Sequence, residues 1–220
     1  MAWAGGRPPK LPDDVITEYM GLLADVSRRL KAGEHRCLAV SGAGPGAGTT
    51  ATVLALAHVA QTKLGWNVLA VEMNQRSPVF RDVVKPEEGA TVAAIVEGKT
   101  QPAQAVTSSP SLKFDLVAFG QAGTLFSGLQ LQGAAEAIRR ELQGRYDAIL
   151  FDTPPITSSA DFFSVARAAD GALLVVEFEQ TRQEVLERVN SQLQRHDLTL
   201  TGTVLNKRRH VIPAWAYRRL

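Results

Sequence analysis

The segment Ser41-Gly-Ala-Gly-Pro-Gly-Ala-Gly-Thr-Thr50 decides how the rest of the chain is interpreted, because it is rich in glycine and joins two different patterns. Before it stands the short apolar run Cys37-Leu-Ala-Val40, which is typical of a buried strand in a parallel sheet. After it, residues 50–64 are rich in alanine and leucine and are predicted to be helical. Glycines in such a loop let the backbone approach a ligand closely, and the N–H groups that open the helix form a cradle for phosphate oxygens. The segment therefore predicts a phosphate site beyond the first strand.

The patterns on either side of this loop alternate between helix and strand. Apolar residues at three- and four-residue steps predict an amphipathic helix over residues 15–31. Further helices are expected at 90–98, 131–142 and 181–195, and further strands at 67–72, 148–151, 172–178 and 202–205. Strands that alternate with helices imply right-handed crossovers, so the predicted fold is α/β, with a mainly parallel sheet and helices on both faces. The expected organisation is an N-terminal extension at 1–14, one domain at 15–206 and a tail at 207–220.

The composition fits one soluble globular domain and excludes disorder, collagen and coiled coil, since 45% of the 220 residues are apolar and 24 basic residues face 22 acidic ones. The single cysteine, Cys37, cannot form an internal disulfide, which suits a reducing cytoplasm. No segment has the ~18 uninterrupted apolar residues that cross a bilayer, so we expect any membrane role to be peripheral.

The last fourteen residues are strongly basic. They hold five cations and no acid, and Trp215 and Tyr217 stand among the cations, which are Lys207, Arg208, Arg209, Arg218 and Arg219. Two interpretations stay open here: a solvated terminus, or an arm that binds anionic surfaces.

The loop departs from the phosphate-binding pattern G-x-x-x-x-G-K-[ST] at a decisive position. With Gly48 as the second glycine, Ala43 stands at the first glycine, Thr49 at the lysine and Thr50 at the hydroxyl that binds magnesium. The lysine is missing, so a glycine-rich turn without a ligand remains an alternative.

Two other strand ends carry acids. In Tyr146-Asp-Ala-Ile-Leu-Phe-Asp152-Thr-Pro-Pro155 a carboxylate ends an apolar strand, which beside a phosphate loop indicates a Walker B acid. In Val68-Leu-Ala-Val-Glu72-Met-Asn74-Gln-Arg76-Ser-Pro78 an acid and an amide stand two residues apart after another strand, and hence on one side of the chain. From the residues alone, a nucleotide site is expected.

Together these segments resemble the cytoplasmic bacterial tyrosine kinases of capsule and exopolysaccharide synthesis, a group within the MinD/ParA-like P-loop ATPases. Residues 41–50 are similar to the family's Walker A loop, residues 68–78 to its Walker A′ segment V-L-L-I-D-A-D-L-R-x-P, and residues 146–155 to its Walker B segment Y-D-Y-V-I-I-D-T-P-P. Ala169-Asp-Gly-Ala-Leu-Leu-Val-Val176 and Gly202-Thr-Val-Leu-Asn206 resemble two later family elements. The resemblance implies a P-loop NTPase-like, three-layer α/β/α fold that binds ATP or ADP with Mg²⁺.

The resemblance also assigns roles to single residues. It implies catalytic positions at Glu72 and Asp152 in a degenerate site, and Mg²⁺ ligands at Thr50 and Asp152. The implied nucleotide-binding residues are Gly44, Gly46, Ala47, Gly48, Thr49, Thr50, Arg76 and Asn206, of which Asn206 falls where the family contacts adenine.

The departures from the family point to weak turnover. Thr49 replaces the lysine, and Glu72 and Asn74 replace the two aspartates of Walker A′. If losing the lysine resembles losing one preorganised donor, the barrier rises by about 3–4 kcal/mol. The cradle of amides, Thr50 and Asp152 survive the changes. We therefore expect a pseudo-kinase that binds nucleotide and turns it over weakly or not at all.

Partners are implied in the same way. The family's ring-forming E-x-x-R-x-x-R motif keeps only Glu18, and its tyrosine cluster is reduced to Tyr217. The leading hypothesis is a cytoplasmic component of exopolysaccharide assembly that regulates a membrane polysaccharide co-polymerase, or chain-length regulator. It allows a homo-oligomer and contact of the basic tail with the anionic inner face of the plasma membrane, and nucleic acid is not expected as a partner. The alternatives are an active tyrosine autokinase or slow ATPase aided by Arg76, and a MinD/ParA-like positioning ATPase.

Overall fold

The computed structural model describes residues 8–30, 36–121, 123 and 125–207. Within them a seven-stranded sheet has the order β3-β4-β2-β5-β1-β6-β7. All neighbouring strands run parallel except β3, which is antiparallel to β4. The strands are β1 (Arg36–Gly42), β2 (Val68–Glu72), β3 (Thr107–Ser109), β4 (Phe114–Val117), β5 (Ala148–Asp152), β6 (Gly171–Glu177) and β7 (Leu200–Asn206).

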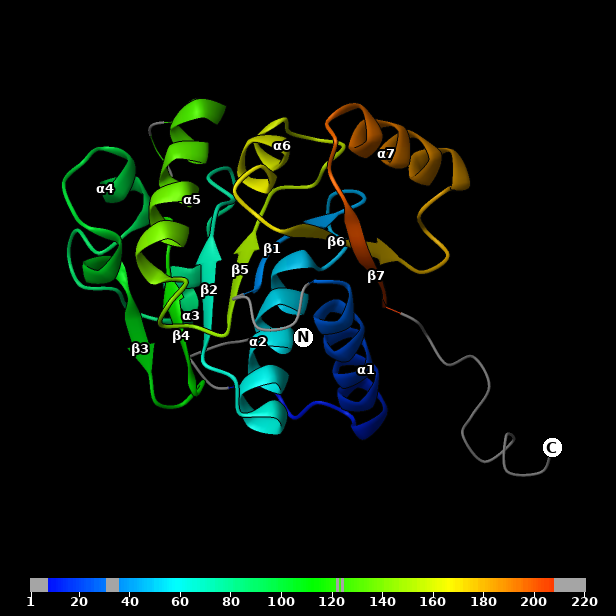
Figure 1. Ribbon diagram of the computed structural model, residues 1–220, viewed down its shortest axis with the longest axis horizontal. Helices are drawn as coiled ribbons and strands as arrows, with labels where there is room; N and C mark the ends of the chain where they lie inside the picture. Colours follow the sequence, from blue (N-terminus) through cyan, green and yellow to red (C-terminus); the bar gives the residue numbers. More distant parts are fainter. Residues whose placement is uncertain (1–7, 31–35, 122, 124, 208–220) are drawn as a thin grey trace.

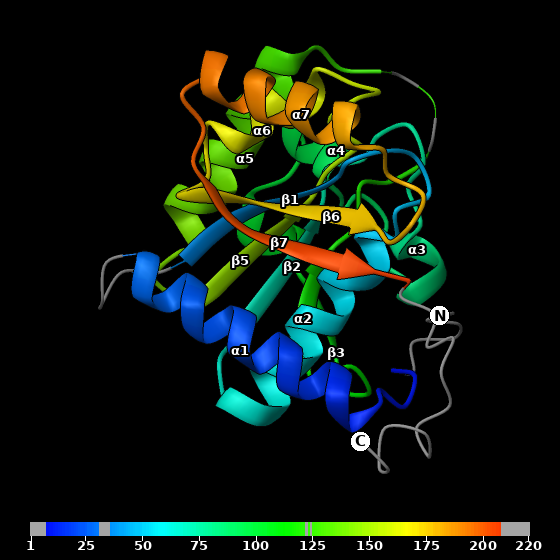
Figure 2. The same ribbon diagram turned by 90° about the vertical axis from the view of Figure 1, so that its right-hand side faces the viewer.

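Helices cover both faces of this sheet, as Figures 1 and 2 show. On one face lie α1 (Asp13–Arg29) and α2 (Thr49–Leu64), and on the other α4 (Val92–Val96), α5 (Gly128–Leu142), α6 (Asp161–Ala166) and α7 (Gln183–Arg195). The short α3 (Phe80–Val83) follows β2, and the 3₁₀ helix η2 (Pro102–Ala105) precedes β3. The expected three-layer α/β/α fold is confirmed.

Alternation along the strands builds two hydrophobic layers, because successive side chains of a strand point to opposite faces. In β1, Leu38 and Val40 pack with α1 and α2, whereas Cys37 faces the cluster under α4 and α5 and Ala39 faces that under α6 and α7. The central strands are therefore buried on both sides, which explains why they read as continuous apolar runs.

The elements expected from the sequence are present with shifts of a few residues at their ends. The first helix begins at Asp13, two residues before the expected start, and Leu11 already packs into the core. The sequence did not predict β3, β4, α3 or α6. The tail lies outside the described residues except for Lys207. No helix among the described residues is both long and apolar enough to span a membrane.

The connections place a crevice at the carboxyl ends of β1 and β5. From β1 the chain passes through α2 on one face to β2, and from β5 it passes through α6 on the other face to β6. Ligands of open α/β sheets bind where the crossovers diverge in this way. The arrowheads of β6 and β7 in Figure 2 point to this edge of the sheet, on the same side as α3.

Candidate functional site

The glycine-rich loop leaves β1 at Gly42 and ends at the first turn of α2. Gly46 and Gly48 adopt left-handed backbone angles, with φ of 78° and 89°, and Gly48 is the N-cap of the helix. No side chain caps this helix, and among the described residues the N–H groups of Gly46, Gly48, Thr49, Thr50 and Ala51 have no hydrogen-bond acceptor. Unpaired amides at a helix N-terminus carry partial positive charge, so the loop can accept an anion.

Thr49 occupies the position where a lysine was expected. Its Oγ1 lies 2.7 Å from the point where a Cβ of Gly42 would stand, so the side chain folds back over the base of the loop. Any larger residue at position 42 would displace it. A short neutral side chain therefore stands where a Walker A loop would carry a long cation, and the loop itself offers an anion only backbone dipoles.

Asn206, at the end of β7, holds the other side of the loop. Its Nδ2 donates to the carbonyl of Ala47 at 2.8 Å, and its Oδ1 accepts from the N–H of Lys207 at 2.8 Å. A Cβ on Gly48 would lie 2.3 Å from the same Nδ2, so only glycine permits this packing. Both ends of the Asn206 amide are thus engaged within the protein, and its predicted contact with adenine stays a prediction.

Thr50 and Asp152 meet at the carboxyl ends of β1 and β5. The Thr50 hydroxyl donates to Asp152 Oδ2 at 2.7 Å, while the buried Oδ1 has no hydrogen-bond partner. The pKa of Asp152 is raised to about 8, mainly by burial; the Thr50 hydrogen bond lowers it and the nearby Glu72 charge raises it. An unsatisfied buried carboxylate oxygen beside a hydroxyl is an arrangement that a divalent cation would complete.

Glu72 is also buried, but its carboxylate is fully engaged. Oε1 accepts from the N–H groups of Val79 and Phe80, and Oε2 accepts from that of Phe119 at 2.9 Å. Burial is the largest effect on the pKa of Glu72 and raises it, while the three amide donors lower it. The side chain joins β2 to α3 and to the end of β4. Its assigned catalytic role remains untested, and its geometry is that of a structural residue.

The two other residues of the Walker A′ segment, Asn74 and Arg76, differ in burial and in their contacts. Asn74 is half-buried and its Oδ1 has no hydrogen-bond partner, so it offers a second free acceptor near the Asp152 strand end. Arg76 is more than half exposed, and its Nε lies 3.9 Å from the carboxylate of Asp161. The predicted contact of Arg76 with a phosphate stays a prediction.

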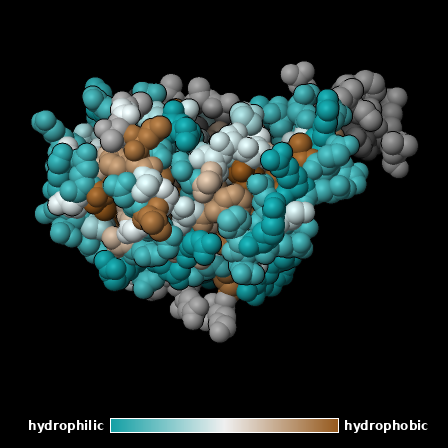
Figure 3. Space-filling view, turned by 90° about the horizontal axis from the view of Figure 1, so that it is seen from above, coloured by the Kyte–Doolittle hydropathy of each residue, from teal (hydrophilic) through white to brown (hydrophobic). Residues whose placement is uncertain are grey.

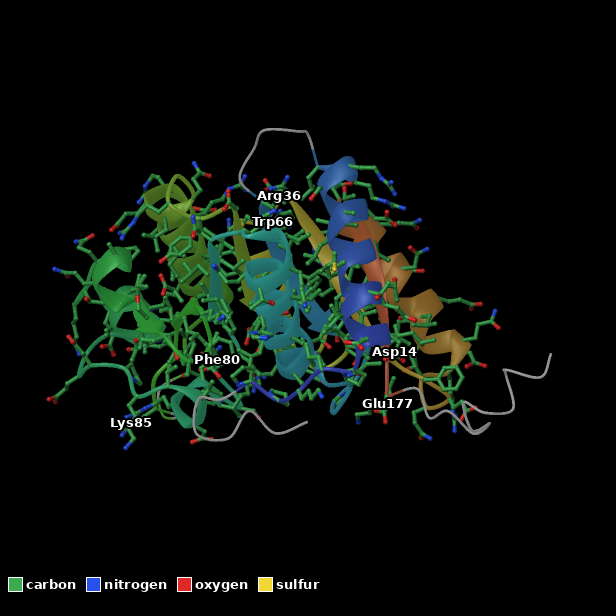
Figure 4. The ribbon with its side chains drawn as sticks, turned by 90° about the horizontal axis from the view of Figure 1, so that it is seen from below. Asp14, Arg36, Trp66, Phe80, Lys85 and Glu177 are labelled. Carbon is green, nitrogen blue, oxygen red and sulfur yellow. The ribbon has the colours of Figure 1, made fainter. Side chains whose placement is uncertain are left out.

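Some residues at this edge of the sheet were not predicted. Gln75 is buried; its Nε2 donates to Phe126 and Asp161, and its Oε1 accepts from the Phe126 N–H, which ties the loop before α5 to the segment after β2. Lys207 forms an ion pair with Glu177 at 3.1 Å, beside the loop. Figure 4 shows Glu177 and Phe80 towards one end of the molecule and the stacked pair Arg36 and Trp66 at the other. The sequence carries no periodicity that would reveal such contacts between distant loops.

The site fits a magnesium nucleotide on its own chemistry. The free amides of residues 46 and 48–51 suit phosphate oxygens, and Thr50 with Asp152 suits Mg²⁺. Bound Mg²⁺ would neutralise phosphate charge there. Among the described residues there is no separate cluster of His, Cys, Asp and Glu that could hold a metal ion.

Comparison with known proteins supports this fold and the expected relatives. Tyrosine-protein kinase YwqD of Bacillus subtilis is 26% identical over 183 residues, which cover 83% of this chain and 75% of YwqD. Two longer curated tyrosine-kinase relatives are spanned only to 24% and 28% of their length.

Solved structures share the fold. The kinase domain of Escherichia coli tyrosine kinase ETK superposes with a TM-score of 0.76 at 19% identity, over 94% of this chain and 86% of that one. MinD of Pyrococcus horikoshii, solved with Mg-ADP, superposes with a TM-score of 0.58 at 19% identity, over 84% and 76% of the two chains. The expected resemblance to capsule and exopolysaccharide tyrosine kinases and to MinD-like ATPases is confirmed.

The strongest assignment comes from a family profile. That of the cellulose biosynthesis protein BcsQ matches residues 35–202, which run from the start of β1 into β7 and include the ends of β1, β2 and β5, with Asn206 just beyond the match. This chain therefore belongs to the BcsQ family of cellulose biosynthesis proteins.

Proposed function

We propose that this protein is a pseudo-kinase of exopolysaccharide assembly, which binds ADP or ATP with Mg²⁺ and transfers phosphoryl groups weakly or not at all. In this role it regulates a membrane polysaccharide co-polymerase from the cytoplasmic side. The observation that carries the proposal is the pairing of a free amide cradle and a free Asp152 oxygen with a neutral Thr49. The amides and the Asp152 oxygen favour binding, and the neutral Thr49 stands in place of the cation that stabilises phosphoryl transfer.

Binding is supported by groups that lack partners inside the chain. Five amides at the loop and the buried Asp152 Oδ1 have no hydrogen bond among the described residues. Buried polar atoms are nearly always satisfied, so the unsatisfied Asp152 Oδ1 favours a ligand that supplies its missing partner, and the amides at the helix N-terminus beside it favour an anion. Phosphate oxygens would accept the hydrogen bonds of the amides, and Mg²⁺ would bind the free oxygen of Asp152.

Weak turnover is supported by what replaces the charged residues. Phosphoryl transfer relies on positioning and on stabilisation of the charge of the transferring group. Thr49 has no charge, Asn74 cannot act as a base, and the Glu72 carboxylate already accepts three amide hydrogen bonds. The alternative of an autokinase aided by Arg76 gains no support from geometry, since that guanidinium faces Asp161.

A docking surface for a partner is supported on the side of α5. Leu125 and Leu129 are exposed by 54% and 81%, which is unusual for leucine and places two apolar side chains at the start of this helix. Seen from above, hydrophobic residues gather on the left of the molecule, over α4 and α5 (Figure 3). We propose this surface as the contact with the co-polymerase. In a pull-down with the cytoplasmic segment of a polysaccharide co-polymerase, Leu129→Glu should reduce recovery more than Arg140→Gln, which makes the same change of charge at an exposed position of the same helix.

The nucleotide proposal is tested by measuring binding and turnover on the same protein. ATP and ADP are titrated by calorimetry with and without Mg²⁺, and radiolabel transfer from ATP is followed in parallel. We expect both nucleotides to bind, Mg²⁺ to tighten binding, and no phosphotyrosine to form. Thr49→Lys should bind ATP more tightly than the unmodified protein without becoming a full kinase, because positions 72 and 74 remain altered.

Two outcomes would contradict the proposal separately. Absence of binding heat for either nucleotide would refute the cradle, whatever the turnover. Phosphotyrosine formed by the unmodified protein at kinase rates would refute the pseudo-kinase assignment and leave binding intact. Lys63→Ala serves as the control for Thr49→Lys, since it changes a lysine at the far end of the same helix.

A further inference from the structure

A groove lies between α1 and the outer edge of β7, away from the crevice at β1 and β5. It has a volume of about 330 Å³. Its walls come from the first turns of α1 and the last residues of β7, namely Asp14, Val15, Glu18, Tyr19, Leu22 and residues 203–207. Figure 2 shows α1 running beside β7, and Figure 4 labels Asp14 on α1. Among these residues, the roles assigned above use only Asn206 in the far wall and Glu18, which remains from the family's ring-forming motif.

The groove combines an acidic rim with an apolar floor. Asp14 and Glu18 stand one helical turn apart and therefore on one face of α1. Val15 and Leu22 supply apolar surface from the helix, and Leu205 supplies it from the strand, where it is exposed by 52%. Such a surface suits a segment that carries cations and aromatic rings together.

The strand side of the groove offers backbone groups as well. β7 is the last strand of the sheet and pairs only with β6 among the described residues, so its other edge has unpaired N–H and C=O groups. An extended peptide can add to such an edge by main-chain hydrogen bonds, with alternate side chains in pockets.

The chain itself provides a segment with the required chemistry. Residues 208–220 follow Lys207, which lines the groove, and they contain four arginines with Trp215 and Tyr217 and no acid. Lys207 has a left-handed φ of 60°, so the backbone changes direction as it leaves β7. Thirteen residues reach about 40 Å when extended, whereas the 17-residue α1 is only about 25 Å long. Length, charge and position all allow this segment to return to the groove.

We propose that the groove between α1 and β7 binds the chain's own basic C-terminal segment, residues 208–220. The arginines meet Asp14 and Glu18, and an aromatic side chain covers the apolar floor beside Leu205. Binding to nucleotide is not required, so the inference stands apart from the pseudo-kinase proposal. In this state the segment's cations face protein acids and are withheld from anionic membranes.

The test is a charge exchange in the full-length chain, followed by hydrogen exchange at residues 13–22 and 200–206. One variant replaces all four tail arginines with glutamate, and a second carries Asp14→Lys and Glu18→Lys. Each should speed exchange in both segments by about fivefold, as expected for the loss of a few partly exposed ion pairs. The combination of both variants should restore slow exchange, which a merely structural role of Asp14 or Glu18 would not do.

A matched control carries Glu184→Lys and Glu187→Lys on α7, which is on the opposite face of the sheet, and should leave both segments unchanged. Equal exchange in the wild type and the tail variant would overturn the proposal. Protection that rises with protein concentration would overturn it in favour of a tail from a second copy. Protection seen only with phosphatidylglycerol vesicles would overturn it in favour of a membrane-bound tail.

Discussion

Glu72 and Asp152 lie opposite each other on neighbouring strands, and the structure uses them in opposite ways. They are register partners in the pairing of β2 with β5, and both are almost fully buried. The Glu72 carboxylate accepts hydrogen bonds only from backbone amides, which belong to residues 79, 80 and 119 on two other segments. Asp152 has one hydrogen bond, from Thr50, and one free oxygen. Of two equivalent positions, one stabilises the fold and the other is available to a ligand.

The difference shows how a site can lose chemistry and keep binding. A glutamate side chain is one methylene longer than aspartate, and this length lets Glu72 reach the start of α3 and the end of β4. Once a carboxylate is held by three amides it no longer presents a free oxygen to a reacting group. Asp152 keeps the shorter side chain and the free oxygen. We therefore expect Asp152 to keep a metal-binding role and Glu72 to have lost a catalytic one.

The largest effect is expected from removing Glu72. Glu72→Ala leaves three N–H groups without their acceptor, and two of these hydrogen bonds, from Phe80 and Phe119, are buried, so it should lower the free energy of unfolding by about 3–5 kcal/mol. Urea unfolding followed by circular dichroism measures this change. Glu88→Ala, at an exposed acid, should stay within about 0.5 kcal/mol of the wild type. A loss under about 1 kcal/mol at position 72 would erase the contrast with Asp152.

Asp152→Asn should affect binding and spare the fold. Without the carboxylate, Mg²⁺ loses its anionic ligand, so the tightening of ATP binding by Mg²⁺ should fall at least about tenfold. Calorimetry with and without Mg²⁺ separates this from binding by the amide cradle, which should be unchanged when no metal is added. Equal Mg²⁺ dependence in variant and wild type would remove Asp152 from the metal site.

The pH dependence of stability sharpens the comparison further. The pKa of Asp152 is raised by burial to about 8 in the folded protein, from 3.8 as the ordinary value. A raised carboxyl pKa means that the folded state binds the proton more tightly, so this stabilisation is complete below about pH 4 and is lost as the pH rises through 8. Between pH 5 and pH 9, the melting temperature of Asp152→Asn relative to the wild type should therefore rise by at least about 3 °C. A constant difference, measured by calorimetric scans without ligand, would contradict the burial of this acid.

Thr50 gives the smallest effect. Its hydroxyl is the single hydrogen-bond donor to Asp152 within the described residues, so Thr50→Val should reduce stability by about 1 kcal/mol. Thr50→Ser retains the donor and serves as the control. If valine and serine behave alike in urea unfolding, the hydrogen bond contributes nothing to folding, and Asp152 is even less engaged than the distance of 2.7 Å indicates.

The fold was largely predictable because four of the seven strands, β1, β2, β5 and β6, are apolar runs buried on both faces. β4 was missed since it is only four residues long and contains Asp115, which accepts a hydrogen bond from the hydroxyl of Tyr146. β3 is three polar residues at the sheet edge, stabilised by pairing with β4 rather than by its own hydrophobicity. These short strands are stabilised by hydrogen bonds to adjacent strands, and a local stretch of sequence does not show which strands will lie beside it.

The site was predictable in part for the same reason. Motif spacing located Thr50 and Asp152, because a strand end and a helix start fix where their side chains stand. The engagement of Glu72 depends on amides at positions 79, 80 and 119, which only the folded chain brings together. The Asn206 contact with Ala47 likewise joins residues 159 positions apart.

That last contact has a mechanical consequence. Asn206 is the final residue of β7, and its side chain grips the carbonyl of Ala47 while its backbone continues into the C-terminal segment. Tension applied to that segment would be shared by the Asn206 side chain, by the Phe178 N–H that donates to the Asn206 carbonyl, and by the Lys207–Glu177 ion pair. The side-chain bond is the part of this linkage that reaches the glycine-rich turn, so a load on the chain end and an anion at the turn would act on the same few atoms.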